Sequence, residues 1–264
     1  MRKLPFQQIA SKWLKTEIML QDRHLAPFLP KTLPWRTNRL FDMLKEYTVV
    51  FLKPDKGGGG TGIIRIEQYA ADVYEVRYLT KRVRVDGKHT LIALLKRRMQ
   101  PGKQYLIQQG IHLKQIEGRP FDIRVIVQKP RSHWQVMGMA AKVAAKEKIV
   151  TNRTSGGLAL TVYRALKRSF GWSDNHIHSV ERWLSHIALQ TAHTLSKRFP
   201  DLRVLGLDIG IDVQGNMWIF EVNTRPQFHL FLKTNPTQYQ KIMTNQRRIV
   251  AEGRMQQRAK SRLR

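Results

Sequence analysis

The sequence predicts an α+β fold in which several strands pair antiparallel. Short runs rich in branched apolar residues recur along the chain, and turn signals separate some of them by only a few residues. Fewer segments show the three- and four-residue apolar spacing of an amphipathic helix. Strands joined by short turns pair antiparallel, so this mixture indicates sheets with helices packed on them.

Length and composition set the class of protein. The chain has 264 residues, 42% hydrophobic and 25% charged, which predicts one domain, or two small ones, with a well-formed core. No apolar run approaches the roughly 20 residues of a membrane span, and the start of the chain lacks the apolar core of a secretory signal. The absence of cysteine excludes disulfide and thiolate chemistry and fits a reducing, cytoplasmic compartment.

The net charge is the unusual property. There are 47 Lys and Arg against 19 Asp and Glu, a formal net charge of +28. Such a surface attracts an anionic polymer, an acidic protein, acidic lipid or nucleic acid, whereas a solvated basic face among acidic neighbours is the alternative. Much of the excess lies in the basic C-terminal tail, residues 236–264, which is predicted to be either a helix or a frayed arm. Nucleic-acid binding rests on net charge alone, because no aromatic-interleaved motif or zinc-finger spacing accompanies it.

The first half of the chain predicts a helical and loop-like segment followed by strands. Residues 1–47 include mixed amphipathic spacing, and the cluster Pro27, Pro30 and Pro34 forbids a long helix there. The expected strands cover residues 48–53, 62–68, 74–79 and 81–88. A helix over residues 88–100 follows, and Pro101-Gly102 stops it.

The second half repeats the mixture. Its expected strands cover residues 104–111, 121–129, 133–145, 203–213 and 217–223, and the last two form a hairpin. The clearest helix covers residues 179–199, with a serine N-cap and apolar residues three and four apart.

A glycine-rich loop at residues 57–62, GGGGTG, is the first functional motif. It satisfies the dinucleotide pattern G-x-G-x-x-G, but that fingerprint needs a helix next, and the residues that follow, IIRI, favour a strand. The Walker pattern fails because no Lys-Ser/Thr follows the last glycine. Four glycines in a row cost more ordering entropy than a plain surface hairpin would justify. The motif therefore predicts a phosphate loop of Gly57, Gly58, Gly59, Gly60, Thr61 and Gly62, with Lys53 reaching the same phosphates.

A hairpin carrying carboxylates is the second motif. A two-residue turn at Gln214-Gly215 places Asp208 opposite Glu221, and Asn223 lies on the same face as Glu221. The same register places Ile209 opposite Phe220. It also places Asp212 opposite Met217, beside the turn, where Asp212 is a candidate for an acid that faces solvent.

Paired acids in an apolar sheet predict a cation. Like charges directly opposite one another are destabilising unless something neutralises them. Mg²⁺ commonly takes one or two carboxylates together with substrate phosphates. Asp208, Glu221 and Asn223 are therefore predicted metal ligands. The alternative is a turn that differs by one residue, so that the acids point to solvent.

A phosphate loop followed by a carboxylate hairpin resembles the layout of the ATP-grasp superfamily. The stretches SKW, LPKT and LKPDKGGGGTGI are similar to the YheC/YheD-type proteins of that superfamily, which are associated with the coat of bacterial endospores. The resemblance implies two α+β subdomains clasping a nucleotide, a lid at 48–111 and a metal-binding subdomain at 112–235. It also implies that the N-terminal domain usual in the superfamily is missing or vestigial.

The resemblance also implies residue roles. Lys53 and the glycine loop match the ATP-phosphate elements of the family, and Asp208, Glu221 and Asn223 match its metal ligands. The adenine hinge falls on Gln108, Gln109, Gly110 and Ile111, where the family often has Glu-Tyr/Phe-Ile. The strand FDIRVIV is similar to the Asp-Ile-Arg strand of RimK-like ligases and places Asp122 and Arg124 near nucleotide or substrate. Lys142 stands where the family usually has arginine, and Asn152 is implied near the phosphates or metal.

The implied function is a ligase of the ATP-grasp type. It would use ATP and Mg²⁺, with two ions expected and Mn²⁺ as an alternative, to activate a carboxylate as an acylphosphate for attack by an amine or similar nucleophile. Arg225, Lys142 and Arg124 are the implied catalytic residues, and a link to sporulation or the spore coat follows from the narrower resemblance. The alternative is a catalytically weak nucleotide-binding module of the spore coat that binds an anionic partner.

Overall fold

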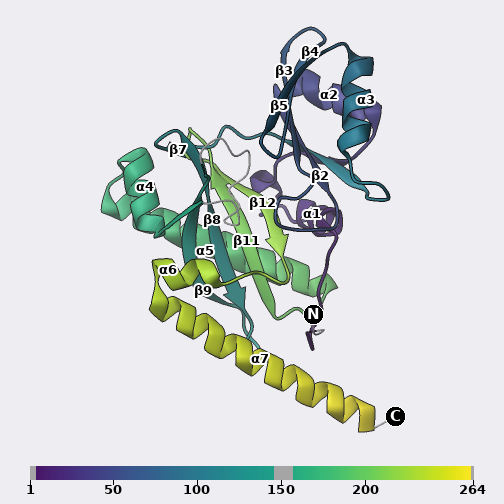
Figure 1. Cartoon of the computed structure of the whole chain (residues 1–264). Coiled ribbons are helices and arrows are strands. Elements are labelled where there is room, and N and C mark those ends of the chain that lie inside the picture. The colour runs from purple at the N-terminus through teal and green to yellow at the C-terminus, as the bar shows by residue number, and fades with distance from the viewer. Residues whose placement is uncertain (1–3, 146–156, 263–264) are drawn as a thin grey trace.

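The computed structural model describes residues 4–145 and 157–262, which form two antiparallel sheets (Figure 1). The first sheet has the strand order β1-β6-β2-β3-β4-β5, and the second has the order β10-β9-β8-β11-β12 with β7 beside β8. The α+β prediction is therefore confirmed. Within the described residues, no helix is long and apolar enough to cross a membrane.

The first sheet packs two helices on one face. Its strands are β1 (Thr32–Pro34), β2 (Val49–Pro54), β3 (Ile64–Ala70), β4 (Val73–Tyr78), β5 (Lys81–Asp86) and β6 (Tyr105–Gln109). Helices α2 (Thr37–Glu46) and α3 (Lys88–Arg98) bury Leu40 and Leu91 against it. Segment 1–47 thus supplies an edge strand, β1, that the sequence analysis did not predict; three residues are too short for a periodicity signal.

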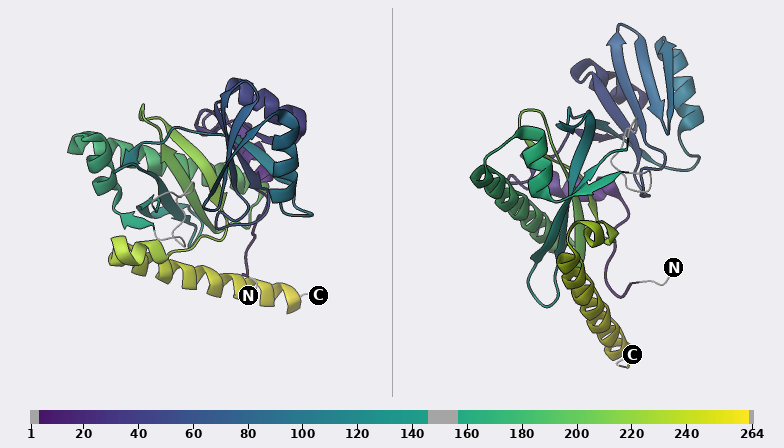
Figure 2. Two further views of the ribbon diagram at one scale, coloured as in Figure 1. Left: turned by 45° about the horizontal axis from the view of Figure 1, so that its top comes forward. Right: turned by 60° about the vertical axis from the view of Figure 1, so that its left-hand side comes forward.

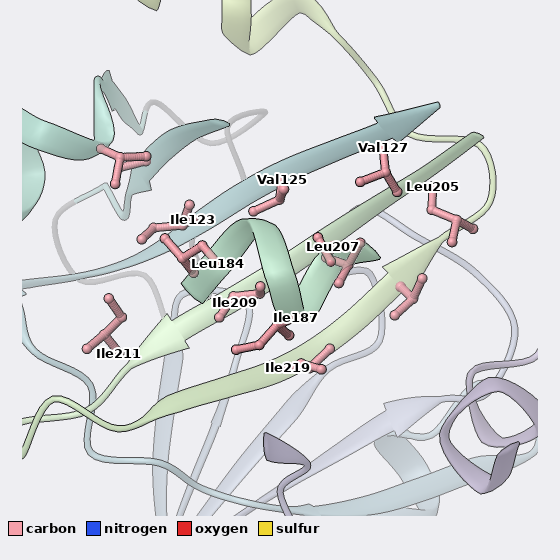
Figure 3. Close-up of a cluster of buried hydrophobic side chains, with 14 of the residues drawn as sticks. Ile123, Val125, Val127, Leu184, Ile187, Leu205, Leu207, Ile209, Ile211 and Ile219 are labelled. Carbon is pink, nitrogen blue, oxygen red and sulfur yellow. The ribbon is translucent and has the colours of Figure 1, made fainter. Parts of the chain in front are cut away.

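The second sheet has helices on both faces. Its strands are β7 (Gln115–Ile116), β8 (Arg119–Gln128), β9 (Gln135–Val143), β10 (Leu158–Leu160), β11 (Val204–Ile211) and β12 (Met217–Asn223). Helices α4 (Val162–Phe170) and α5 (Asp174–Arg198) cover one face, and α6 (His229–Thr234) and α7 (Pro236–Arg262) pack on the other (Figures 1 and 2). Figure 3 shows Leu184 and Ile187 of α5 lying against the branched side chains of β8 and β11. Every residue of β11 is buried, so the strand that carries Asp208 has little freedom to move.

Two helices differ from the prediction. The long helix α5 begins at Asp174 rather than at residue 179, because Ser173 is the N-cap and its hydroxyl accepts a hydrogen bond from the His176 amide at 3.3 Å. Helix α4 was not predicted; Thr161 caps it and Gly171 ends it in a left-handed conformation. The basic tail is a helix, the first of the two predicted alternatives.

Helix α1 (Lys12–Leu20), followed by the short 3₁₀ turn η1 (Ala26–Phe28), joins the two sheets. It contacts β1 of the first sheet as well as β12 and α5 of the second. Its buried residue Met19 belongs to the core of the second sheet. The N-terminal segment therefore lies at the junction of the two sheets and bridges them.

Candidate active site

A cavity of about 210 Å³ lies where the two sheets meet, and most of the predicted site residues line it. Those residues are Lys53, Gly57, Gly58, Gly59, Gly60, Thr61, Gln109, Ile111, Asp122, Arg124, Lys142, Asp208, Glu221 and Asn223. The predicted residues Gly62, Gln108, Gly110 and Arg225 do not line it, and Asn152 lies outside the described residues. The fold thus brings together two motifs, the glycine loop and the carboxylate hairpin, that are separated by 146 residues from Gly62 to Asp208.

The glycine loop connects β2 to β3, as the strand-loop-strand interpretation required. Gly59 and Gly60 have φ of 74° and 76°, a backbone region that glycine adopts without strain. A Cβ on Gly57 or Gly58 would meet nothing within 4 Å, so these two glycines leave open space over the cavity. At Gly62, φ is 79° and a Cβ would lie 2.9 Å from the Pro54 ring. The first part of the loop is open, and its end is packed.

Lys53 is the penultimate residue of β2, the strand that leads into the loop. Its ammonium donates a hydrogen bond to the Gln108 side chain and lies 5.6 Å from the ring centre of Phe220. Burial lowers the pKa of Lys53 to about 8, although Glu221 opposes that shift. Gln108 therefore positions this lysine and lies behind the cavity, rather than contacting a ligand through its own side chain.

Lys12, the first residue of α1, is a second lysine at the loop, and the sequence analysis assigned it no role. Its ammonium donates to the carbonyl oxygen of Gly57 at 2.7 Å and lies 3.5 Å from Glu221 Oε1. Asp55 holds the start of the helix in place, because its carboxylate accepts the Trp13 amide at 2.8 Å. The only sequence signal was the serine N-cap in SKW, which marks a helix start but not a ligand.

The predicted pairing of Asp208 with Glu221 is confirmed. The predicted pairs Ile209–Phe220 and Asp212–Met217 are wrong, because a bulge shifts the register between Asp208 and Ile209. Ile209 pairs with Ile219 instead, and the hairpin turn is longer than two residues. The longer turn and the bulge each shift the register by one residue in opposite senses, so the pairing of the acids survives.

Asp212 does not face solvent. It is 6% exposed and accepts hydrogen bonds from the backbone amides of Gln214 and Asn216 at 3.0 and 2.8 Å and from the Trp218 indole at 2.8 Å. Burial would raise the pKa of Asp212, but these hydrogen bonds lower it below its ordinary value. Asp212 therefore organises the turn of the hairpin, a role that the assumed two-residue turn concealed.

A ladder of opposite charges crosses β8, β9 and β11 at the base of the cavity. Asp208 accepts from Arg124 Nε at 2.7 Å, from Arg124 Nη2 at 3.0 Å and from Lys142 Nζ at 2.7 Å. Lys142 also lies 2.9 Å from Asp122. Burial would raise the pKa of Asp208, but Arg124 and Lys142 lower it to about 2, so this carboxylate is ionised at neutral pH.

The predicted hinge residues divide into those that line the cavity and those that do not. Gln109 lines the cavity, and its side-chain oxygen accepts the Lys31 amide at 3.1 Å. Gly110 donates to the Val49 carbonyl at 2.8 Å, and a Cβ there would lie 2.6 Å from Val49 Cγ1. Only a glycine permits this close approach. Apolar side chains that the sequence analysis did not assign to the site complete the cavity wall; they are Phe51, Ile63, Leu113 and Phe220.

Asp208, Glu221 and Asn223 fit a divalent cation that shares its coordination shell with another ligand. They offer two carboxylates and an amide oxygen to the same cavity, which is a donor set that hard cations prefer. Among the described residues, no group of three or more His, Cys, Asp and Glu side chains is arranged to hold an ion alone. A cation here would therefore need further oxygen ligands, such as phosphates.

Arg225 lies two residues beyond the end of β12 and is exposed. The preceding Thr224 is buried, and its hydroxyl accepts the Ile9 amide at 2.9 Å. The N-terminal segment therefore fixes the end of β12, and Arg225 lies outside the cavity beside Asn223.

The comparisons with known proteins agree with this geometry. Residues 5–248 match the family model described as YheC/D like ATP-grasp. The chain is 29% identical over 235 residues to the endospore coat-associated protein YheD of Bacillus subtilis (strain 168), covering 85% of this chain and 50% of YheD. It is 23% identical over 249 residues to YheC of the same organism, covering 89% of this chain and 65% of YheC. The chain thus spans between half and two thirds of the length of these relatives.

Solved structures share the fold at low identity. D-alanyl-alanine synthetase A from Vibrio cholerae matches with a TM-score of 0.55 and 10% identity over 92% of this chain and 65% of its own. The D-alanine-D-alanine ligase from Coxiella burnetii matches with a TM-score of 0.55 and 12% identity over 95% of this chain and 59% of its own. The family match covers nearly the whole chain, and the predicted resemblance is confirmed: this protein belongs to the YheC/D-like ATP-grasp family.

Proposed function

We propose that this protein is an ATP-dependent ligase that joins a carboxylate to an amine, or to a similar nucleophile, through an acylphosphate. One observation carries the proposal. A single cavity holds the open glycine loop, four cations and the Asp208–Glu221 pair; the cations are Lys12, Lys53, Arg124 and Lys142. Phosphoryl transfer depends mainly on positioning and charge stabilisation, and this set of groups offers both.

The nucleotide binds with its base against the apolar wall and its phosphates under the loop. Phe51, Ile63 and Ile111 supply apolar contact for a flat base, and the hinge backbone beside Gln109 supplies polar groups. The amides of Gly57 and Gly58 can approach phosphates closely because nothing projects from their Cα atoms. This arrangement makes the loop a cover for the triphosphate.

The charged residues divide the chemistry between them. Lys53 and Lys12 neutralise phosphate oxygens, and Arg124 and Lys142 hold the Asp208 carboxylate in one orientation. Asp208, Glu221 and Asn223 would hold Mg²⁺, which would supply positive charge to neutralise the nucleotide phosphates.

The reaction proceeds in two displacements. An oxygen of the acyl substrate's carboxylate attacks the γ-phosphorus, and ADP leaves. The amine then attacks the acyl carbon, and the bond from that carbon to the bridging oxygen breaks. Inorganic phosphate leaves with that oxygen and its electron pair, and the nitrogen loses a proton. Arg225, outside the cavity beside Asn223, holds the acyl substrate through a charge-assisted hydrogen bond to its carboxylate.

A nucleotide-binding module without turnover is the second candidate. Both oxygens of Asp208 are already engaged by cations of the protein itself, which weakens the donor set for a metal. The names of the relatives YheD and YheC support an association with the spore coat for either candidate. In the second candidate the protein would serve as an assembly component of that coat, with its basic surface engaging an anionic partner.

The test uses the purified chain with Mg²⁺ and ATP, with Mn²⁺ as a replacement, and with mixed carboxylate and amine acceptors. Phosphate release that depends on both acceptors and is lost in Glu221→Gln supports the ligase. Thermal stabilisation by ADP without phosphate release supports the module. Absence of any ADP effect on the melting temperature would overturn both, since each requires nucleotide binding.

A further inference from the structure

Helix α7 extends beyond the body of the protein. Its 27 residues span about 40 Å, and its first part packs on the second sheet through Ile242 and Ile249, which are 0% exposed. The packed part ends near Gly253, where a Cβ would lie 2.7 Å from the Pro5 carbonyl oxygen. The C-terminal end of the helix then projects away from both sheets (Figures 1 and 2).

Three arginines form a straight stripe on this helix. Arg247, Arg254 and Arg258 stand seven and then four residues apart, a spacing that places them on one helical face over about 16 Å. All three are exposed, and none makes an ion pair within the described part of the chain. The acid of this helix, Glu252, is bound by Arg203 at 2.6 Å and Arg248 at 2.9 Å. The stripe therefore carries unneutralised charge.

Positive charge also gathers on the body beside the helix. The backbone amide of Lys129 donates to the Arg203 carbonyl at 2.8 Å, and Arg203 in turn contacts α7 through Glu252. Burial, and next the charge of Arg203, lower the pKa of Lys129. Residues 236–262 contain seven Lys and Arg and one Glu. The electrostatic potential near this helix is therefore positive, as the net charge of +28 is for the whole chain.

We propose that the Arg247–Arg254–Arg258 face of α7 binds the phosphate backbone of double-stranded nucleic acid without sequence preference. Arginine forks match phosphate oxygens in pairs, and a bare helix is narrow enough to lie along or within the major groove. Nucleic-acid interfaces are polar and strongly positive, as this face is.

The surface does not suit the other classes of polyanionic partner. Among the exposed side chains from residue 254 to 259, Met255 is the large apolar one, at 63% exposure. Protein interfaces draw their energy from buried aromatic and apolar anchors, and a helix lying on a membrane needs an apolar face. The projecting end of α7 offers neither.

The test is fluorescence anisotropy of a labelled DNA duplex of mixed sequence, titrated with the full chain at several salt concentrations. The slope measured is that of the logarithm of the association constant against the logarithm of the salt concentration. We expect the triple variant Arg247→Gln/Arg254→Gln/Arg258→Gln to reduce the steepness of this slope by about 2.7, because each phosphate contact contributes about 0.9 to it. When salt is raised from about 50 to about 200 mM, the variant should therefore lose about 40-fold less of its affinity for the duplex than wild type does. A second duplex of unrelated sequence should give the same affinity.

The matched control is Lys96→Gln/Arg97→Gln/Lys103→Gln, which removes the same net charge from exposed positions at the C-terminal end of α3 and just beyond it. It should keep the wild-type slope. Equal losses in both variants would show that net charge alone attracts DNA and would overturn the proposal. So would the absence of duplex binding by the wild type, or tighter binding to polyglutamate or to phosphatidylserine vesicles. The melting temperature of each variant without ligand serves as a folding check, because all the substituted side chains are exposed.

Discussion

Arg124 and Asp208 face each other across β8 and β11 and share two hydrogen bonds, at 2.7 and 3.0 Å. Sequence reasoning assigned the neutralisation of the paired acids to a metal ion. In the folded chain the protein itself does much of that work, because Arg124 and Lys142 balance Asp208 and Lys12 lies 3.5 Å from Glu221. The Asp208 carboxylate is thereby held ionised, and both carboxylates have cationic partners before any ligand arrives.

Removing the Asp208 charge should destabilise the protein. Asp208→Asn leaves Arg124 without its carboxylate partner and Lys142 with Asp122 alone in a largely buried site, so we expect the free energy of unfolding to fall by about 3 kcal/mol in urea titrations. Glu221→Gln is the matched control. Its contact with Lys12 is longer and Glu221 is 25% exposed, so its loss should cost less than about 1 kcal/mol. Equal costs for the two variants would contradict the ion-pair ladder.

The same ladder predicts acid sensitivity. The pKa of Asp208 is about 2 in the folded chain, against 3.8 for the ordinary carboxyl, because Arg124 and Lys142 outweigh the effect of burial. A lowered pKa stabilises the fold fully above pH 3.8, and this contribution, about 2 kcal/mol, is lost as pH falls towards 2. Unfolding free energies measured between these pH values should therefore fall more steeply for wild type than for Asp208→Asn. Parallel pH profiles would refute the shift.

The fold and half of the site follow from local signals, and the remainder depends on tertiary contacts. The glycine run and the apolar hairpin carry strong patterns, so a loop between two strands and the Asp208–Glu221 pair were predictable. That the two motifs line one cavity was expected only from the family resemblance. The bulge beside Phe220 has no pattern, since any residue can occupy it. Lys12 is one basic residue among 47 Lys and Arg, and only packing of α1 against Asp55 places it at the loop.

Substitution by alanine should destabilise the protein at one glycine of the loop and leave its stability unchanged at another. At Gly62, φ is 79° and a Cβ would lie 2.9 Å from Pro54 and 3.0 Å from the Tyr105 hydroxyl, so Gly62→Ala should cost about 2 kcal/mol of unfolding free energy. At Gly58 a Cβ meets nothing within 4 Å, so Gly58→Ala should keep the wild-type melting temperature.

The two variants also separate packing from binding. Under the proposed function, Gly58→Ala places a methyl group where phosphates approach the loop and should weaken ADP binding several-fold. Calorimetric titration with ADP measures this, and adenosine serves as the ligand control because it lacks phosphates. A Gly58→Ala protein that binds ADP as wild type does would remove this glycine from the phosphate site.

Lys53 should couple ADP binding to a proton. Burial lowers the pKa of Lys53 to about 8, Glu221 partly restores it, and Lys12 lowers it further. Phosphates placed beside the ammonium favour its charged form and raise that pKa, so ADP binding above pH 8 should take up a proton. ADP affinity should accordingly be constant below pH 8 and decline as pH rises above it, by at most tenfold per pH unit.

Calorimetry at a pH just above 8, in two buffers of different ionisation enthalpy, measures the proton directly. The apparent binding enthalpies should differ between buffers for wild type and agree for Lys53→Met, which has no proton to gain. Lys45→Met is the matched control, because that lysine is 76% exposed and does not line the cavity, so its variant should retain the wild-type difference. Identical binding enthalpies in both buffers would mean that Lys53 is already charged in the free protein. In that case Glu221 would raise the pKa of Lys53 by more than burial and the charge of Lys12 lower it.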